Sequence, residues 1–146
     1  MILIGQFDSP FVRRVAIAMR LCGHAFEHRP WSVFGDGEKI ARFNPLMRVP
    51  TLVLDEGPEG REVLIESSAI LDALDQMAGP AKAMNPASGE ARRHALKICS
   101  LATGMNDKAV SMVYEALIHN RVTPAWIERC CSQIAGVLSE LEESRA

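Results

Sequence analysis

The chain has 146 residues, of which 48% are hydrophobic and 23% are charged, and its formal net charge is −2. This balance is typical of one globular domain, or of a small domain with part of a second, and supplies enough apolar residues for a core. The basic pair Arg13–Arg14 is too small for a nucleic-acid-binding patch. No apolar run reaches the ~18 residues that a membrane span needs. The N-terminus shows no basic region followed by a signal-like apolar segment. We therefore expect a cytoplasmic protein that binds neither nucleic acid nor membranes.

The first half of the chain alternates strand-like and helix-like patterns. Apolar residues recur at helical spacing over 10–22. Pro30 favours an edge position for the strand around it, and the short helix before Pro45 must end there. Gly79 marks the end of the last helix in this half. The predicted elements are strands at 2–5, 25–33, 50–55 and 61–66, a turn at 57–60, and helices at 10–22, within 35–45, and at 67–77.

The composition changes beyond this point. Residues 79–89 contain two prolines, three alanines and two glycines, which predicts a linker, and no strand pattern recurs after it. Residues 90–119 predict a long helix interrupted by the small residues 102–104, and Thr123 with Pro124 predicts the start of a further helix. The apolar stripe of that last helix consists of Ile127, Cys131, Ile134, Leu138 and Leu141.

The order of these elements predicts the fold class. The first two strands are joined through a helix, so they are expected to be parallel with a right-handed crossover. The last two strands are expected to form an antiparallel hairpin. The prediction is an α/β domain over 1–79 with the order βαβαββα, a linker over 80–89, and an all-α region over 90–146.

Neither the cysteines nor the histidines predict a metal site. The cysteines form no C-x-x-C pair and lack zinc-finger spacing, and their neighbours are apolar helical residues. His24 and His28 flank a strand-like segment rather than one face of a helix, so we expect no metal there. Buried free thiols are expected at Cys22, Cys99, Cys130 and Cys131.

The segment "FDSPFVRRV", residues 7–15, places a serine where a helix begins. Pro10 suits the first helical position, so Ser9 is expected to cap the helix. The same place permits a second role. A helix N-terminus presents free amides and a partial positive charge that favour an anion such as a thiolate, and a hydroxyl there can donate a hydrogen bond that lowers the thiol pKa. From the residues alone both interpretations stay open.

Two other segments end a strand or begin a helix with polar groups. In "NPLMRVPTLVL" the backbone of Val49, just before Pro50, is placed to pair with an extended peptide-like ligand. In "IESSAI" Glu66 ends a strand and Ser67 opens a helix, which offers a site for a carboxylate and one for an ammonium group. The alternative for the second segment is a cap with a solvated glutamate. Because such ends fall on one edge of the sheet in this class of fold, the segments together favour a small thiol peptide with a free amino acid end.

The motifs "SPFVRRVAIAM", "FNPLMRVPTLVL" and "IESSAILDAL", in this order and spacing, resemble the glutathione transferases, specifically their soluble bacterial branch. The resemblance extends over the helical second half of the chain. It implies a thioredoxin-like N-terminal domain, an all-helical C-terminal domain, a homodimer, and a detoxification reaction in which glutathione is the co-substrate and no cofactor is required. Met105 and Met112 are apolar residues available for the partner subunit.

The resemblance also implies a role for individual residues. The bond before Pro50 is expected to be cis. The implied roles are Ser9 at the glutathione sulfur, Phe11 at the border of the site, Arg48 at the glycine carboxylate, Val49 and Pro50 at the cysteinyl backbone, and Glu66 and Ser67 at the γ-glutamyl end.

Two departures from the family pattern affect the functional interpretation. Members with redox or thiol-transfer activity carry a cysteine at or near the position of Ser9, and this chain has none there. The chain also ends at Ala146, shortly after the second long helix of the C-terminal region, whereas family members continue with several more helices. We therefore expect an incomplete C-terminal domain whose last helix is only partly covered.

Three functions are compared on these grounds. The first is an enzyme that adds the glutathione thiolate to a small electrophile, with Ser9 stabilising the thiolate. The second is a non-catalytic glutathione-binding or protein-interaction module of the same fold, which the short C-terminal region favours. The third, thiol–disulfide exchange, needs a reactive cysteine at the start of the first helix and is therefore disfavoured.

Overall fold

The computed structural model describes residues 1–57, 60–118 and 122–144, which fold into two compact units, Met1–Met84 and Asn85–Ala146. The first unit is a thioredoxin-like mixed sheet with helices, and a helical region follows it, so the predicted fold class is confirmed. The elements are β1 (Ile2–Ile4), α1 (Pro10–Cys22), β2 (Glu27–Arg29), α2 (Gly37–Ala41), β3 (Thr51–Gly57), β4 (Gly60–Ile65), α3 (Ser67–Ala78), α4 (Gly89–Leu117) and α5 (Pro124–Glu143).

The four strands form one sheet in the order β2-β1-β3-β4. β1 pairs parallel with β2 and antiparallel with β3, and β3 pairs antiparallel with β4. The predicted parallel pair and the predicted hairpin are therefore both present, and β2 lies at an edge as Pro30 indicated. Within the turn predicted at 57–60, residues 58–59 lie outside the described part of the chain.

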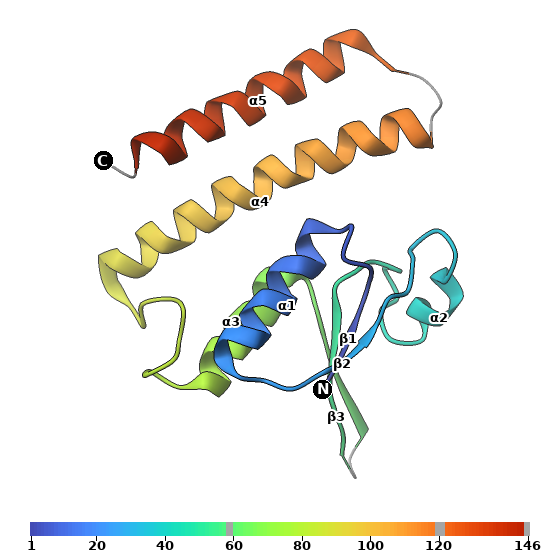
Figure 1. Ribbon diagram of the computed structural model, residues 1–146, viewed down its shortest axis with the longest axis vertical. Helices are drawn as coiled ribbons and strands as arrows, with labels where there is room; N and C mark the ends of the chain where they lie inside the picture. Colours follow the sequence, from blue (N-terminus) through green and yellow to red (C-terminus); the bar gives the residue numbers. More distant parts are fainter. Residues whose placement is uncertain (58–59, 119–121, 145–146) are drawn as a thin grey trace. The chain divides into compact units, whose positions relative to one another are not determined.

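Each face of the sheet is covered by different helices, as Figure 1 shows for α1 and α3 on one face and α2 on the other. Side chains of a strand alternate between the faces. Leu3 accordingly packs with residues of α1 and α3, whereas its neighbour Ile4 packs with Ile40 of α2. The central strands β1 and β3 are thus buried on both faces.

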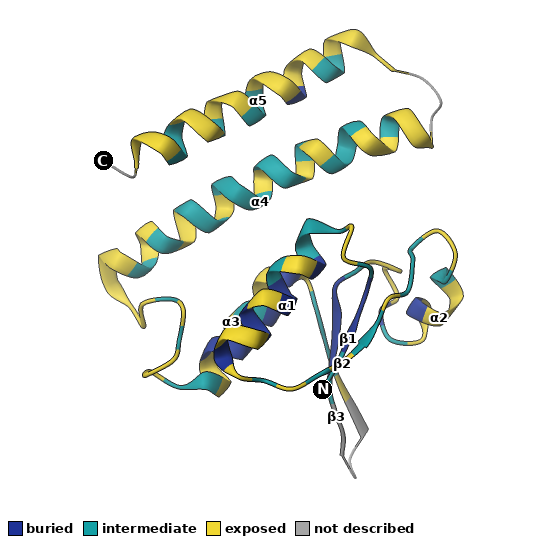
Figure 2. Cartoon of the chain, viewed as in Figure 1, coloured by how far each residue is buried: buried dark blue, intermediate teal, exposed yellow. Residues whose placement is uncertain are grey.

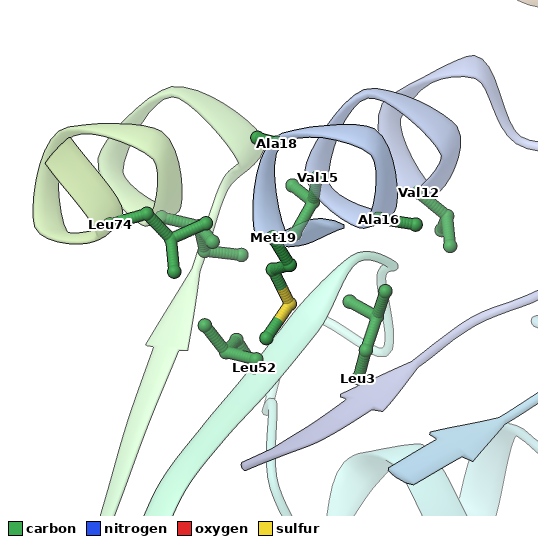
Figure 3. Packing of buried hydrophobic residues seen from close by; sticks show 9 residues of the cluster. Leu3, Val12, Val15, Ala16, Ala18, Met19, Leu52 and Leu74 are labelled. Carbon is green, nitrogen blue, oxygen red and sulfur yellow. The ribbon is translucent and has the colours of Figure 1, made fainter. Parts of the chain in front are cut away.

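Helix α1 has a clear start, a buried face and a clear stop. The Ser9 side chain caps it by accepting a hydrogen bond from the Val12 amide, and Pro10 occupies the first turn. Gly23 ends it in the left-handed conformation, with φ 79°. Its buried residues point toward the sheet, and Figure 3 shows Met19 directed at Leu52 of β3. The core around Met19 consists of Leu3, Val12, Val15, Ala16, Ala18, Leu52, Ile70 and Leu74.

The first unit ends in a segment that is fastened to α3. The buried Asp75 accepts a hydrogen bond from the Met84 amide through Oδ1, at 2.8 Å. The division between the units follows directly, between Met84 and Asn85.

The second unit is a pair of packed helices, α4 and α5. Lys97 of α4 donates to Glu140 of α5 at 2.6 Å, and this ammonium holds the pKa of the Glu140 carboxyl below its ordinary value. The predicted interruption at 102–104 was wrong, because α4 is continuous there. Thr103 is accommodated by donating its hydroxyl back to the Cys99 carbonyl at 2.9 Å. The predicted end of the first of these helices, at residue 119, lies outside the described residues.

Ile127, Ile134 and Leu141 of the predicted stripe are half-buried, but Cys130 and Val137 take the places that the stripe gave to Cys131 and Leu138. Cys130 is fully buried and Val137 is half-buried, whereas Cys131 and Leu138 are exposed. Figure 2 shows that most of α5 is exposed and that its more buried positions lie on the side toward α4. A stripe through Cys130 and Val137 and a stripe through Cys131 and Leu138 both have the helical spacing of three and four residues. The sequence pattern therefore cannot choose between them, and the contact with α4 does. The expectation of buried thiols therefore holds for Cys22 and Cys130 and fails for Cys131; all four are free.

Substitution of the central core methionine tests this packing. Met19→Ala should lower the free energy of unfolding by about 2–5 kcal/mol, because a large side chain is removed from a filled core. Met77→Ala is the matched control, since Met77 of α3 is 44% exposed and a surface substitution changes stability by less than about 0.5 kcal/mol. Chemical denaturation of both variants measures the difference, and equal losses would contradict the assignment of the core.

Candidate functional site

The loop between β1 and α1 positions Ser9 through several polar contacts. Ser9 has extended backbone angles, φ −69° and ψ 121°, and its Oγ accepts from the Val12 amide at 3.3 Å. Its own amide donates to Asp8 Oδ1 at 2.8 Å. Arg13 donates to the carbonyls of Phe7 at 2.6 Å and Asp8 at 3.1 Å. The capping role predicted for Ser9 is therefore confirmed. Arg13, on the helix, holds the loop that precedes Ser9.

The cap leaves the Ser9 hydroxyl proton available. A hydroxyl has one donor and two acceptor positions, and the Val12 amide uses an acceptor position. The first turn of α1 carries no acidic side chain that would neutralise the helix terminus. The half-buried Phe11 follows in the same turn. This terminus can therefore take an anion, with Ser9 as a donor to it.

The segment before β3 is fixed by a buried asparagine that the sequence analysis missed. Asn44 is 1% exposed and donates to the Arg48 carbonyl at 2.9 Å and to Thr51 Oγ1 at 3.2 Å. The Thr51 hydroxyl donates to the same Arg48 carbonyl at 3.1 Å. The bond between Val49 and Pro50 is cis, as the resemblance implied. A polar residue placed before a proline, "NP", was the available signal for this anchor.

Gly5, at the end of β1, brings this segment close to α1. A Cβ on Gly5 would lie 2.6 Å from Val12 Cγ2 and 2.8 Å from Val49 Cβ, and its φ is 132°. Only a glycine permits both the approach and the backbone angle. The start of α1 and the Val49 segment thus both lie against the point where a side chain of residue 5 would project, a position that the sequence analysis did not single out.

Glu66 stands between β4 and α3 in an unusual conformation. Its φ is 66° and its ψ is 122°. Residues other than glycine rarely adopt this backbone conformation, which costs of order 1–3 kcal/mol. Its side chain forms no capping hydrogen bond and instead pairs with Arg48, with Nη1 and Oε1 3.1 Å apart. Both side chains are more than half exposed. Two residues that were assigned to opposite ends of a ligand are therefore paired with each other here.

Ser67 at the first position of α3 is buried and contacts a residue that the sequence analysis did not assign to the site. Arg14 of α1 donates to Ser67 Oγ at 3.1 Å and lies 3.5 Å from Ser68 Oγ. Because the guanidinium has no acceptor, Ser67 must accept this bond, which leaves its proton to donate elsewhere. Arg14, in the first half of α1, was the available signal, but its target on α3 depends on tertiary packing.

The strand register brings these residues to one end of the sheet. Thr51 pairs with Ile65 of β4 and with Ile4 of β1, so the residues that follow Ile4 and Ile65 and precede Thr51 are neighbours. Arg48, Val49, Pro50, Glu66 and Ser67 are among these neighbouring residues at the end of the sheet. Ser9 and Phe11 belong to the start of α1, which comes close to them at Gly5. The three motifs therefore form one cluster: two helix N-termini with a strand end between them.

The cluster lies within a region that matches a known protein family. The profile described as "Glutathione S-transferase, N-terminal domain" matches residues 3–82, which are 80 of the 146 residues. The chain belongs to the glutathione S-transferase family. The matched range contains all residues of the cluster.

Two curated relatives have a similar sequence. The uncharacterized GST-like protein YibF of Escherichia coli K12 is 34% identical over 113 residues, 77% of this chain and 54% of that protein. Glutathione S-transferase U4 of Arabidopsis thaliana is 34% identical over 76 residues, 51% of this chain and 32% of that protein. The chain thus spans about half, or less, of the length of these relatives.

Two solved transferase structures are also similar. A family member from Pseudomonas fluorescens Pf-5 with bound glutathione has a TM-score of 0.83 at 28% identity, covering 97% of this chain and 70% of that chain. A glutathione S-transferase from Methylobacillus flagellatus KT with bound glutathione has a TM-score of 0.85 at 26% identity, covering 97% of this chain and 68% of that chain.

The described part of the chain offers neither a metal cluster nor a membrane span. Within residues 1–57, 60–118 and 122–144, no three or more His, Cys, Asp or Glu side chains are grouped to hold a metal ion. None of the described helices is long and apolar enough to cross a bilayer.

The close approach at Gly5 gives a testable consequence. Gly5→Ala should destabilise the first unit by more than about 2 kcal/mol, because overpacking adds ~1–3 kcal/mol to the backbone cost. Gly23→Ala is the matched control: Gly23 also has positive φ, 79°, but nothing lies within 4 Å of the point that a Cβ would occupy there. It should therefore show the backbone cost alone, about 1 kcal/mol. Equal unfolding free energies for the two variants would contradict the packing described for Gly5.

Proposed function

We propose that this protein binds glutathione through its N-terminal unit and adds the glutathione thiolate to small electrophiles, as a homodimer of the bacterial branch with serine at the thiol site. The observation that carries the proposal is the meeting of the three motifs at one end of the sheet, joined through Gly5. Bound glutathione in the transferase structures of 28% and 26% identity supports the choice of ligand.

The thiolate would lie at the start of α1. The Ser9 hydroxyl keeps its proton for the sulfur while its oxygen caps the helix. A hydrogen bond to the charged form and the positive helix terminus both favour the thiolate, so they lower the thiol pKa. Phe11, in the same turn, would border the sulfur.

The rest of the tripeptide would extend across the cluster. Val49 would pair its backbone with the cysteinyl residue, with Pro50 beginning the strand behind it. The first amides of α3 and the Ser67 hydroxyl proton, which the bond from Arg14 leaves available, would hold the γ-glutamyl carboxylate. Glu66 would hold the γ-glutamyl ammonium, and Arg48 the glycine carboxylate.

The Arg48–Glu66 pair is compatible with this binding mode. An exposed ion pair is worth only about 0–1 kcal/mol, so its separation or sharing costs little. Ligand charges of the opposite sign can therefore replace it. In the free protein the pair keeps both side chains near the position that the ligand would occupy.

The proposed chemistry needs few further groups. The thiol proton passes to solvent, and the sulfur of the thiolate uses an electron pair to form a bond to the electrophilic carbon. With an aryl halide the carbon–halogen bond breaks and the halide leaves with that bond's electrons. Thiolate formation and proximity supply most of the acceleration, because a thiolate is already a strong nucleophile.

Two measurements test the proposal together. Calorimetric titration with glutathione tests binding, and turnover of a chlorodinitrobenzene with glutathione tests conjugation. We expect both from this chain. Binding without turnover would favour the glutathione-binding or interaction module in place of the enzyme. Failure to bind glutathione would overturn the proposal as a whole.

The role of the serine hydroxyl can be separated from its role as a cap. Ser9→Gly should keep the helix, because glycine costs the cap only a few tenths of a kcal/mol (about 0.3), but it removes the donor to the thiolate. The thiol pKa of bound glutathione should then rise, and the rate should increase only at higher pH than in the wild type. Ser9→Thr, which keeps a hydroxyl, should retain the wild-type profile. A pH–rate profile that is the same for Ser9→Gly and the wild type would reduce Ser9 to a cap.

Ser67 is expected to affect binding rather than chemistry. Ser67→Ala should raise the KM for glutathione by about 10-fold, since a hydrogen bond to a charged group is worth ~1.5–3 kcal/mol, and should leave kcat unchanged because the contact is equal in ground and transition states. The control ligand is an analogue with γ-aminobutanoyl in place of γ-glutamyl, which lacks the α-carboxylate. The variant and the wild type should bind that analogue equally, and a loss for both ligands would show that Ser67 acts on the fold alone.

A further inference from the structure

We propose that His28 is a positioning residue for the thiol site: its imidazole fixes the loop of residues 5–9 and thereby places the Ser9 hydroxyl. The inference rests on the proposed function, because it concerns the same thiolate. His28 lies on β2, outside the three motifs, and touches the loop through two different contacts.

The first contact is a hydrogen bond. His28 Nε2 lies 2.8 Å from the Gly5 carbonyl oxygen, and the contact is partly buried. A carbonyl can only accept, so Nε2 must carry the proton in this bond. The imidazole therefore serves as a donor that sets the direction of the Gly5 peptide group.

The second contact is a ring stack. The Phe7 and His28 rings are 4.1 Å apart between centroids and 14° from parallel. Phe7 is 41% exposed, so burial alone does little to fix it. Stacking on His28 therefore holds the middle of the loop, two residues before Ser9.

The sheet register explains why this position of β2 has the role. His28 pairs with Leu3, and paired residues of neighbouring parallel strands project to the same face, which is the face covered by α1. Glu27 and Arg29 project to the other face, where they pair with each other at 2.7 Å. Among the residues of β2, His28 alone thus faces the start of α1.

A small shift of the loop would reach the thiol site directly. A Cβ on Gly5 would lie within 3 Å of both Val12 and Val49, so a shift of the Gly5 backbone toward that side would press on one or both of them. The Val12 amide donates to Ser9 Oγ, and Val49 is the proposed partner of the cysteinyl backbone. Misplacement of a reacting group by ~1 Å can cost up to about 100-fold in rate. His28 therefore acts on the chemistry through Gly5, without touching the ligand.

Three substitutions separate the donor from the ring. His28→Gln places an amide donor near the Nε2 position. His28→Asn carries the same amide on a shorter side chain that cannot reach Gly5. His28→Phe keeps the ring and removes the donor. Phe7→Leu removes the stack while leaving β2 unchanged, and serves as the second route should a β2 variant fail to fold.

Three quantities are measured for each variant. The ultraviolet absorbance of bound glutathione thiolate as a function of pH gives the thiol titration. Turnover of a chlorodinitrobenzene gives kcat, and a binding titration gives the affinity for S-methylglutathione. S-methylglutathione has no ionisable thiol, so it reports on the rest of the site. We expect His28→Asn and His28→Phe to move the thiolate titration to higher pH and to lower kcat by about tenfold at neutral pH, with unchanged affinity for S-methylglutathione. His28→Gln should keep a thiolate titration and a kcat close to those of the wild type. Phe7→Leu should move both in the same direction as His28→Phe, but by less.

The remaining outcomes overturn the inference. Thiolate titration and kcat equal to wild type in His28→Phe and Phe7→Leu would show that the loop is placed without His28. Parallel loss of S-methylglutathione affinity in all His28 variants, His28→Gln included, would show that His28 only supports the fold. If wild-type protein shows no glutathione thiolate, the proposed function itself fails, and this inference fails with it.

Discussion

The close approach of three backbone segments at Gly5 is the constraint on which the site depends. The end of β1 lies against both the first turn of α1 and the segment before β3, and a single methyl group at residue 5 would clash with both. The sheet order places β1 between β2 and β3, so this strand end is the one that can touch all of the neighbouring elements. The parts that meet there are a helix N-terminus, a strand end and an edge histidine, and each is held by the position of the others.

Polar residues at this end of the sheet largely satisfy one another while keeping capacity for a ligand. Asn44 and Thr51 fix the Arg48 carbonyl, Arg14 occupies an acceptor position of Ser67, and Arg48 pairs with Glu66. Ser67 keeps its hydroxyl proton to donate, and under the proposed function the exposed Arg48–Glu66 pair is weak enough to open for the ligand. The strained backbone of Glu66 is consistent with this, because such conformations persist where the surrounding structure imposes them and they concentrate at functional sites.

The sequence predicted the parts of the structure that depend on local patterns. Helix α1 with its serine cap, and the pairing of the strands, follow from residue types and spacing that act within a few positions. The parts that it did not predict depend on contacts between distant segments. Nothing near Arg14 indicates Ser67, nothing near Gly5 indicates Val49, and the choice of Cys130 over Cys131 depends on which side of α5 meets α4. The expected break in α4 failed for the same reason: small residues weaken a helix locally, but packing against α5 stabilises it.

The same topology explains why two anion sites and one thiol peptide belong together under the proposed function. β4 runs parallel to β1, because each is antiparallel to β3. The helices that follow these two strands therefore begin at the same end of the sheet, and both pack on the same face. Their N-termini are alike in charge but differ in their hydroxyls: Ser9 precedes α1 as a cap, and Ser67 is the first residue of α3. A ligand that spans them needs a negative group at each end of a short extended chain, as a thiolate and a carboxylate of one tripeptide provide. Arg14, on α1, reaches the start of α3 and holds the two termini at a fixed separation, so the spacing of the two sites is set by helix packing and not by the ligand.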